Sequence, residues 1–560
     1  MRLYAQPGTF ERLLDTATTF WHNNTLPRQG GDDGVIVVEA LHQDIRVALR
    51  TLSVANGLRR VSPASVVAVT GTDEDWYEAL WSGFDVALVD RLARAYGATD
   101  VMDIHALVDA RLAAADGPMP DLMVAGRHLP EIAAGIAPHD LEAIVDATAC
   151  RLLRVPRLTA ADRSGATYAR LRRRTIEFSC VYDMIFAALR PTALVTSHVD
   201  YNQWGLAVES AMRFGVPVIH VQSTGTLKAY ALFPSARRGA PTFRAELTHQ
   251  IGEFFDKHVY GNRAQIHRSA ELVSWRSKGN LGRPSWWRAG SSAEAELLTG
   301  AERASLRPHA LDRFGFDRDK PVITVFNHAV SDALGTNVEL FDDLGGWFEA
   351  TAEFAAARTD ANWLFLDHPS QALYDRTGFF DRVAARHAAA ANMVFRRSRS
   401  ISKNMLWTLT DLGVTVRGSV SNELPAYGIP TLQAGWSEWS ACGLGAVATD
   451  RDDYWRRLDS SIGGIVAGVP QLDAEQIERA RLWHWLYRSG SDVSTQLVQH
   501  WEAMAGDDLM RRIMTAMAHV ESDGDPLFAS TRRMWTRKEP MLTRFDLSMS
   551  AESLGDELWG

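Results

Sequence analysis

The sequence predicts an α/β protein built from two successive doubly wound parallel sheets. Short, continuous apolar runs recur along the chain, as is typical of strands covered on both faces by helices. Helix-like segments separate these runs, so strands and crossover helices alternate. The length of 560 residues exceeds what a single hydrophobic core usually reaches, roughly 250–300 residues. At least two domains are therefore expected.

The first half of the chain holds the first series of elements. Strands are predicted at 35–39, 65–71, 192–197 and 218–222, and helices at 43–56, 168–189 and 205–214. The segment 192–222 has the pattern of a compact β-α-β unit, for which a right-handed crossover is the default.

A second series follows an interruption rich in Gly, Ser, Pro, Lys and Trp at 276–303, which indicates an interdomain segment. Strands are predicted at 322–326, 363–366, 393–395, 412–417 and 431–434, with a helix at 344–357 and long closing helices within 475–514. The polar tail beyond Glu521 is expected to be loosely held. The predicted domains are a Rossmann-like domain at residues 1–303, a second Rossmann-like domain at residues 304–506, and a helical tail at 507–560.

Composition excludes several classes of function. Hydrophobic residues make up 46% and charged residues 23%, which is ordinary for a soluble globular protein. A net charge of −9 spread over this length does not favour a nucleic-acid binder. The N-terminus lacks the apolar core of a signal peptide, and no run approaches the ~18 apolar residues of a membrane span. Three scattered cysteines form no disulfide framework, so a reducing, cytoplasmic compartment is expected.

His368 is the first candidate site residue. It follows an apolar strand and precedes Pro369, which restricts it to extended geometry and holds it at the strand end. An imidazole there can donate a hydrogen bond to a phosphate oxygen. A turn histidine without a ligand is the alternative.

The segment Gly418 to Glu423 is the second candidate. Glycine allows close approach of the backbone, and hydroxyl, amide and backbone N–H donors follow it near a predicted helix start, where anions bind. The donor side chains are Ser419, Ser421 and Asn422. Glu423 could accept hydrogen bonds from ribose hydroxyls or could simply lie in a helix first turn, where a carboxylate is favoured.

Two further residues lie at predicted element ends of the second domain. Asp332, after the strand 322–326, is a candidate for binding sugar hydroxyls or for acid/base work, and otherwise a turn residue. Ser402 could cap the helix that carries residues 404–410, bind the nucleotide, or do both.

The general base is expected from the first domain. His198 and Asp200, after the strand 192–197, are the leading pair, with Glu39 and His42 behind them. No Asp-x-Asp sequence stands in a context that suggests a metal-dependent transferase. Phosphate charge is therefore expected to be handled by His, Ser and helix amides, without metal or cofactor.

The order of these motifs resembles the bacterial capsule polysaccharide biosynthesis proteins, relatives of the capsule Kdo transferases. The order is strand-Asn-x-x-x-x-Asp, a Phe/Trp-rich helix, strand-x-His-Pro, Ser at a helix start, and Gly-Ser-x-x-x-Glu-x-x-x-x-Gly-x-Pro, over residues 320–445. The resemblance implies a glycosyltransferase B-type fold, with two Rossmann-like domains facing across a cleft.

The resemblance also implies roles for single residues. His368 and Ser402 would contact donor phosphates, Ser419 and Glu423 would line the nucleotide pocket, and Asp332 would lie near the reacting sugar. The family usually has a basic residue before His-Pro, whereas this chain has Asp367, a departure that bears on the charge of the donor.

The expected function is transfer of a sugar from a nucleotide donor to a surface polysaccharide or lipid-linked acceptor. Two alternatives stay open: a CDP-polyol phosphotransferase of the teichoic-acid polymerase type, and a non-catalytic scaffold of a polysaccharide assembly complex. The expected partners are a nucleotide sugar and the acceptor, without nucleic acid. Peripheral contact with the inner face of the membrane is left open.

Overall fold

The computed structural model contains two compact α/β units that share the chain unevenly. It describes all residues except 1–5, 28–33, 42–44, 73–75, 77–85, 115–120, 223–225, 237–238, 240–241, 268–299, 333–339, 499–505, 521–523 and 560. Unit 1 comprises Met1–Leu152, Thr159–Leu247 and Gly490–Asp546, and unit 2 comprises Leu153–Leu158, Thr248–Ser489 and Leu547–Gly560. The chain therefore changes units at 247/248 and again at 489/490, whereas the predicted domain limits lay at 303/304 and 506/507.

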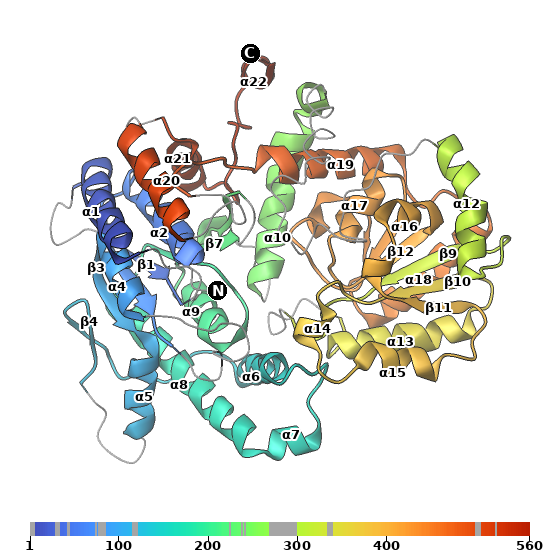
Figure 1. The fold of residues 1–560 in the computed structure, drawn as a ribbon, viewed down its shortest axis with the longest axis horizontal. Helices are drawn as coiled ribbons and strands as arrows, with labels where there is room; N and C mark the ends of the chain where they lie inside the picture. Colours follow the sequence, from blue (N-terminus) through green and yellow to red (C-terminus); the bar gives the residue numbers. More distant parts are fainter. Residues whose placement is uncertain are drawn as a thin grey trace. The chain divides into compact units, whose positions relative to one another are not determined.

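Each unit has a six-stranded sheet in the doubly wound order 3-2-1-4-5-6. In unit 1 the order is β3-β2-β1-β6-β7-β8, parallel except for the antiparallel edge strand β8. In unit 2 the order is β11-β10-β9-β12-β13-β14, parallel throughout. This strand order is that of dinucleotide-binding sheets, and it confirms the predicted fold class of two Rossmann-like units (Figure 1).

The elements of unit 1 fit the predicted strands closely. Its strands are β1 (Gly34–Glu39), β2 (Ala64–Thr70), β3 (Ala98–Asp103), β6 (Ala193–Thr196), β7 (Val218–Gln222) and β8 (Lys228–Leu232). Its helices are α1 (Pro7–Asn24), α2 (Ile45–Arg59), α4 (Val86–Ala95), α5 (Ile104–Ala113), α6 (Pro138–Leu153), α7 (Ala160–Ser164), α8 (Ala166–Leu189), α9 (Leu206–Arg213), α20 (Gly506–His519) and α21 (Pro526–Arg537), and a small antiparallel pair joins β4 (Met123–Val124) to β5 (Arg127–His128). The predicted β-α-β unit is confirmed as β6, α9 and β7, with β6 and β7 parallel.

The prediction of a loosely held tail is wrong. Helix α21 inserts Leu527, Phe528 and Met534 into the core of unit 1, and each is at most 2% exposed. The following segment covers the edge strand β8, because Ala231 N–H donates to Pro540 O and Leu542 N–H donates to Ala229 O. Pairing in this way protects an edge that would otherwise expose unpaired backbone groups.

Unit 2 is a three-layered sandwich. Its strands are β9 (Val322–Phe326), β10 (Asn362–Leu366), β11 (Met393–Arg396), β12 (Leu412–Thr415), β13 (Thr431–Gln433) and β14 (Ala446–Val447). Its helices are α10 (Phe243–Phe254, which begins in unit 1), α12 (Gly300–Phe314), α13 (Leu344–Ala357), α14 (Gln371–Tyr374), α15 (Phe379–Arg386), α16 (Lys403–Leu409), α17 (Val420–Ala426), α18 (Arg451–Val466), α19 (Ala474–Trp485) and α22 (Ala551–Trp559).

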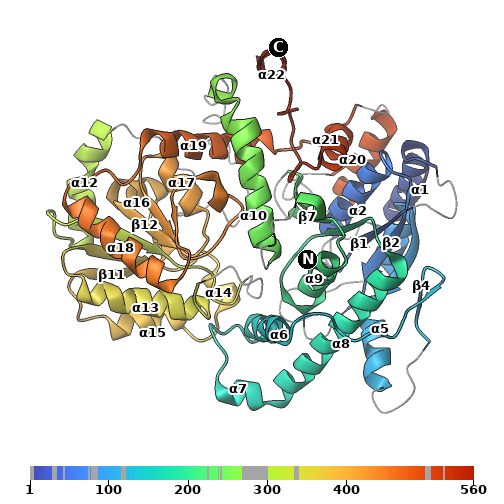
Figure 2. The same ribbon diagram turned by 180° about the vertical axis from the view of Figure 1, so that it is seen from behind.

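Aromatic side chains hold the layers of unit 2 together. On one face, Phe348 of α13 packs edge-on against Phe365 of β10, and Trp347 Nε1 donates to the Tyr454 hydroxyl of α18, which lies beside α13 in the view from behind (Figure 2). On the other face, α12 and α16 pack apolar residues against β9 and β10. The sheet is thus buried on both faces, which explains the continuous apolar strands in the sequence.

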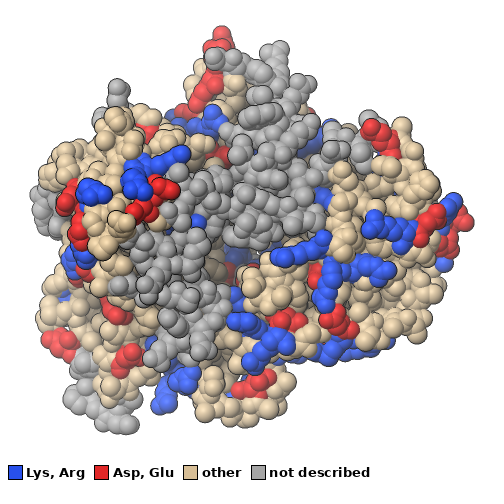
Figure 3. Space-filling model, in the orientation of Figure 1, with Lys and Arg blue, Asp and Glu red and all other residues tan. Residues whose placement is uncertain are grey.

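Three further features of the structure concern the charged surface, the cysteines and the helices that could cross a membrane. Acidic and basic side chains are interspersed over the face of unit 2 shown in Figure 3, and ion pairs such as Arg318–Asp312 and Arg358–Asp360 join them. Cys150, Cys180 and Cys442 are buried, and none of the three forms a disulfide. Within the described ranges, no helix has the length and apolar character to cross a membrane.

Candidate functional site

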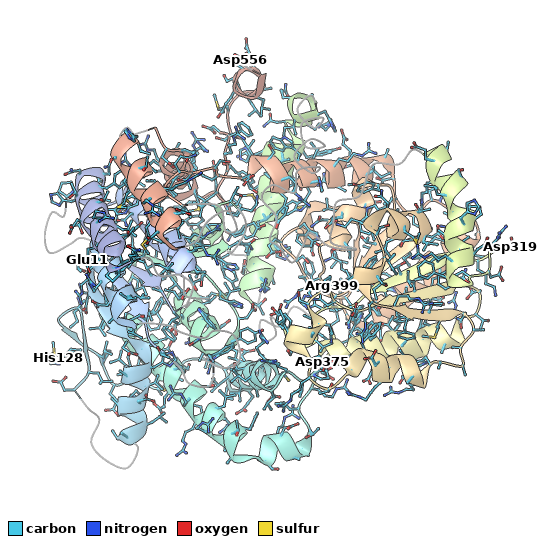
Figure 4. All side chains as sticks on the ribbon, viewed as in Figure 1. Glu11, His128, Asp319, Asp375, Arg399 and Asp556 are labelled. Atoms are coloured by element: carbon cyan, nitrogen blue, oxygen red, sulfur yellow. The ribbon has the colours of Figure 1, made fainter. Side chains whose placement is uncertain are left out.

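The carboxyl edge of the unit 2 sheet gathers most of the predicted site residues. In a doubly wound sheet, ligands bind at this edge, at the point where the strand order reverses. Here the reversal lies between β9 and β12. The loops after β9, β10, β11 and β12 carry Asn327 to Asp332, Asp367 to Ser370, Arg397 to Ser402, and Val416 to Ser419. Arg399 and Asp375, labelled in Figure 4, lie in the loop after β11 and in the loop that follows α14.

His368 is held in one neutral tautomer. The backbone N–H of Ser370 donates to His368 Nδ1 over 3.2 Å, so the ring proton of the neutral form lies on Nε2. Burial, together with the positive charge of Arg399, lowers the pKa of His368 to about 4. The imidazole is therefore uncharged at neutral pH and presents Nε2–H as a hydrogen-bond donor.

A second histidine lies beside it. The rings of His328 and His368 stack at 6.0 Å between centroids with planes inclined by 24°. His328 Nδ1 lies 3.3 Å from Ala329 O, a contact in which the ring nitrogen is the donor. His328 is part of the segment singled out in the sequence, but only the fold shows that two imidazoles meet.

The carboxylate of Asp367 is hydrogen-bonded to other residues of the protein. It accepts from Arg397 Nη1 at 3.1 Å and from Ser398 N at 2.6 Å. The acidic residue before His-Pro, which departs from the family pattern, thus ties the loop after β10 to the loop after β11. Its negative charge is paired with an arginine at this edge.

The turn from Gly418 to Glu423 is closed largely by its own hydrogen bonds. Gly418 N–H donates to Thr415 Oγ1 at 3.2 Å, and a Cβ at position 418 would lie 2.9 Å from that oxygen. The Ser421 hydroxyl donates to Gly418 O and accepts from Trp439 Nε1. The backbone N–H groups of Ser421, Asn422 and Glu423 donate to Gly418 O or Ser419 O. Ser421 and Asn422 are buried, and the hydroxyl of Ser421 and the backbone N–H groups of both residues close the turn.

Glu423 forms a buried ion pair that the sequence analysis missed. Lys403 Nζ donates to Glu423 Oε2, and the Ser419 hydroxyl donates to Oε1 at 3.1 Å. Lys403 is only 4% exposed and lies 5.3 Å from the ring centre of Trp407. The carboxylate therefore links α17 to α16. A lysine at the first position of a helix, where the dipole disfavours a cation, was a signal in the sequence for such a pair.

Ser402 caps α16, as one of its two predicted roles requires. Its Oγ accepts from Met405 N at 3.3 Å. Asp332 lies in the turn after β9, where its N–H donates to Ala329 O at 2.8 Å, and its side chain is half-buried. Both residues lie on loops at the carboxyl edge of the sheet.

Asn327 follows β9 directly and is 6% exposed. Within the described part of the chain, neither its Oδ1 nor its Nδ2 has a hydrogen-bond partner. Leaving a buried polar group unpaired costs about 1–3 kcal/mol. Such a cost at the reversal point of the sheet is typical of a residue whose partner is a ligand.

The predicted residues of unit 1 form a separate group at the carboxyl edge of its own sheet. Glu39, at the end of β1, accepts from Leu41 N and from both Ser197 N (2.8 Å) and Ser197 Oγ, so it joins the two central strands β1 and β6. Its buried carboxylate thus has a structural role. His42 lies outside the described residues.

His198 and Asp200 lie close together, but in an arrangement that differs from a general-base pair. The N–H groups of Val199 and Asp200 both donate to His198 Nδ1 at 3.1 Å, which places the proton of the neutral ring on Nε2. Asp200 is buried and pairs with Arg244 at 2.8 Å. In this tautomer Nε2 of His198 is therefore a donor. Next to it, Tyr201 has a φ of 68°, a strained value for a residue with a side chain.

The comparisons with known proteins concern structure alone. No family model and no curated protein matches the sequence. Among solved structures, the chain is similar to the beta Kdo 2,4 transferase KpsC of Thermosulfurimonas dismutans, with 11% identity, 58% of this chain and 87% of that chain covered, and a TM-score of 0.32.

Two further similar solved structures are an epimerase and a second glycosyltransferase. The UDP-GlcNAc 2-epimerase of Neisseria meningitidis, bound to UDP-GlcNAc, has 12% identity, covers 81% of this chain and 99% of that chain, and has a TM-score of 0.25. A glycosyltransferase of Rickettsia africae has 9% identity, 88% and 100% coverage, and a TM-score of 0.26. At these scores the likeness does not decide the activity, and the fold class follows from the strand order.

Proposed function

We propose that the protein is a glycosyltransferase that takes a sugar from a nucleotide donor bound at the carboxyl edge of the unit 2 sheet. The observation that carries the proposal is His368. A neutral imidazole, whose Nδ1 accepts from a backbone N–H so that Nε2–H remains as the donor, suits a phosphate oxygen of a bound nucleotide sugar. It lies on a parallel sheet of the dinucleotide-binding order.

Other residues of the same edge have supporting roles in the proposal. Ser402 and Ser419 bring hydroxyls to the loops after β11 and β12. The carboxylate of Glu423, which pairs with Lys403, is assigned to a ribose hydroxyl as well. Asp332, in the loop after β9, is assigned to the reacting sugar.

The acceptor is assigned to a surface polysaccharide or lipid-linked sugar, as the motif order in the sequence suggests. His198 of unit 1 is assigned to this part of the reaction as a hydrogen-bond donor through Nε2. That role replaces the general base expected from the sequence. A CDP-polyol phosphotransferase would use the same phosphate-binding edge, and product analysis separates the two reactions.

The test compares two variants at position 368 with a control histidine. His368→Ala removes the donor, and His368→Gln keeps an N–H group near the position of Nε2. Losing a hydrogen bond to a charged group costs about 1.5–3 kcal/mol, so Ala should weaken nucleotide-sugar binding at least tenfold and Gln less. His387→Ala serves as the control, because burial also lowers the pKa of this histidine but it follows α15, away from the loops of the site.

Binding is measured by thermal shift and calorimetry with UDP-glucose, UDP-N-acetylglucosamine, GDP-mannose, dTDP-glucose and CMP-N-acetylneuraminic acid. At a hundred times its dissociation constant, a ligand of the folded state stabilises by about 2.7 kcal/mol. Unchanged affinity in His368→Ala would refute the assignment. Transfer of a polyol phosphate rather than a sugar would favour the phosphotransferase.

A further inference from the structure

Asn327 is a buried polar residue of unit 2 that the proposed site leaves unexplained. It is 6% exposed, and across the described chain both ends of its side-chain amide lack a hydrogen-bond partner. Its own backbone N–H is used, because it donates to Leu366 O at 3.1 Å. The main chain is therefore fixed in the sheet while the side chain remains unsatisfied.

The position of Asn327 points to a ligand rather than to a packing defect. It is the first residue after β9, the strand at which the order of the sheet reverses. Two neighbouring strands are also followed by a buried polar atom that has no hydrogen-bond partner in the described structure. These atoms are Gln371 Oε1, at the start of the short helix α14 after β10, and Ser398 Oγ, just after β11. Unpaired polar atoms thus follow three adjacent strands at one edge.

The chemistry of an amide narrows the class of ligand group. Oδ1 only accepts and Nδ2 only donates, so a group that satisfies both must donate and accept together. A phosphate oxygen only accepts. A sugar hydroxyl does both, and His368 with its Nε2–H already supplies a donor suited to phosphate.

We infer that Asn327 binds a hydroxyl of the transferred sugar and sets the specificity of the enzyme for that sugar. The inference rests on the proposed function. A site that pairs a substrate hydroxyl with a buried amide rejects an analogue without that hydroxyl, because the amide is then left unpaired. Asn327 is thus assigned to the sugar, and His368 to the phosphates.

A buried asparagine in the same sheet provides a matched control. Asn362, at the start of β10, is 2% exposed and fully bonded: its Oδ1 accepts from Asp317 N, and its Nδ2 donates to Asp317 O and Lys320 O. Asn362→Leu therefore removes bonds that the ligand-free protein makes, whereas Asn327→Leu removes only unpaired atoms.

The experiment measures melting temperature and binding in the full-length protein. Without ligand, Asn362→Leu should melt several degrees earlier, and Asn327→Leu should melt at or above the wild-type temperature. The nucleotide sugar of the panel above that binds the wild type should bind Asn327→Leu at least tenfold more weakly. The matching free nucleotide should bind both proteins within twofold.

Four results would overturn the inference. If Asn327→Leu melts as early as Asn362→Leu, the amide is bonded without ligand, through water, and its role is structural. If the nucleotide sugar binds Asn327→Leu as well as it binds the wild type, Asn327 does not contact the sugar, and the proposed function stands without it. If the free nucleotide also loses affinity, Asn327 contacts the nucleotide. A wild type that binds no member of the panel would contradict the proposed function itself, and the inference with it.

Discussion

At the scale of single residues, the protonation state of His368 distinguishes two ways of binding a phosphate. With a pKa of about 4, the ring stays neutral between pH 6 and 8 and binds through its N–H alone. Affinity for a nucleotide sugar, whose diphosphate has no group that titrates in this range, should therefore be constant. An imidazolium with an ordinary pKa near 6.5 would lose its charge across the range, and affinity would fall by more than about tenfold. Calorimetric titrations of nucleotide-sugar affinity at pH 6, 7 and 8 distinguish a neutral ring from a charged one.

The sequence predicted which residues lie at the carboxyl edge of the unit 2 sheet better than it predicted their contacts. The His-Pro turn and the Gly-Ser turn were found because strand ends and rigid residues are visible locally. The partner of Glu423 was missed, because Lys403 lies 20 residues away and only the packing of α16 on α17 joins them. The tautomers of His198 and His368 depend on backbone N–H groups, whose direction no local pattern reports.

At the scale of elements, the buried pair between α16 and α17 makes a stability prediction. Glu423→Gln leaves the charge of Lys403 buried without a carboxylate, and breaking a buried pair in this way costs about 3–5 kcal/mol. The melting temperature should fall by several degrees. Lys403→Met combined with Glu423→Gln should recover most of the loss.

The double variant also tests the ribose contact of Glu423. Glu423→Gln loses stability whether or not Glu423 binds the ribose. The melting temperature of this single variant therefore does not test the ribose contact. In the stable double variant, a smaller preference for ribose over deoxyribose donors would support the contact. An unchanged preference, measured by competition binding, would assign Glu423 to the ion pair alone.

Contact between α2 and α21 should reverse the usual gain in stability when a glycine within a helix is replaced by alanine. Alanine in place of an exposed mid-helix glycine gains about 1 kcal/mol. A Cβ at Gly57 would lie 2.7 Å from Thr531 Oγ1 and 2.8 Å from its Cγ2, and such overpacking costs about 1–3 kcal/mol. Gly57→Ala should therefore lower the melting temperature of unit 1.

Gly463 in α18 is the control, because a Cβ there meets nothing within 4 Å. Gly463→Ala should raise the melting temperature slightly. Calorimetry on both variants measures whether the melting temperature falls in Gly57→Ala and rises in Gly463→Ala. A gain in both would mean that Thr531 moves aside at no cost.

The accuracy of the predicted elements follows from their composition. Helix α13 and strand β9 both begin and end at the predicted residues, because apolar residues define both segments clearly. Helix α21 was not located within the predicted helical tail, nor was its burial expected, because Ser, Thr and Arg outnumber its buried apolar residues. Strand β3, with the sequence ATDVMD, was missed because its acidic residues hide the pattern.

At the scale of the whole molecule, buried histidines predict loss of stability in acid. Burial lowers the pKa of His105 to about 4, of His220 to about 3 and of His368 to about 4. Since the unfolded chain takes up these protons below about pH 6.5 and the folded chain does not, stability should fall from pH 6.5 toward pH 4. Above pH 6.5 these groups should have no effect.

Urea midpoints at pH 7.0, 5.5 and 4.5 measure this slope. His220→Leu removes one proton-binding group from the unfolded chain and should flatten the slope. His128→Ala is the control, since the imidazole of His128, labelled in Figure 4, is 69% exposed. An equal slope in wild type and His220→Leu would show that other groups cause the acid sensitivity.

The division into units was the part of the architecture that the sequence left hidden. Local patterns locate helices in 475–514 but do not tell which sheet they cover. The structure assigns residues 490–546 to unit 1, more than 240 residues after the preceding segment of that unit ended at Leu247.

This return of the chain has a consequence for synthesis on the ribosome. The core of unit 1 includes Leu509, Ile513 and Phe528, which emerge after the whole of 248–489 has been made. Until then the first two hundred and more residues expose apolar surface that only the late helices cover, the condition in which nascent chains aggregate or engage chaperones. The unit whose synthesis begins first can therefore complete its core only after residues 248–489 of the other unit have been made.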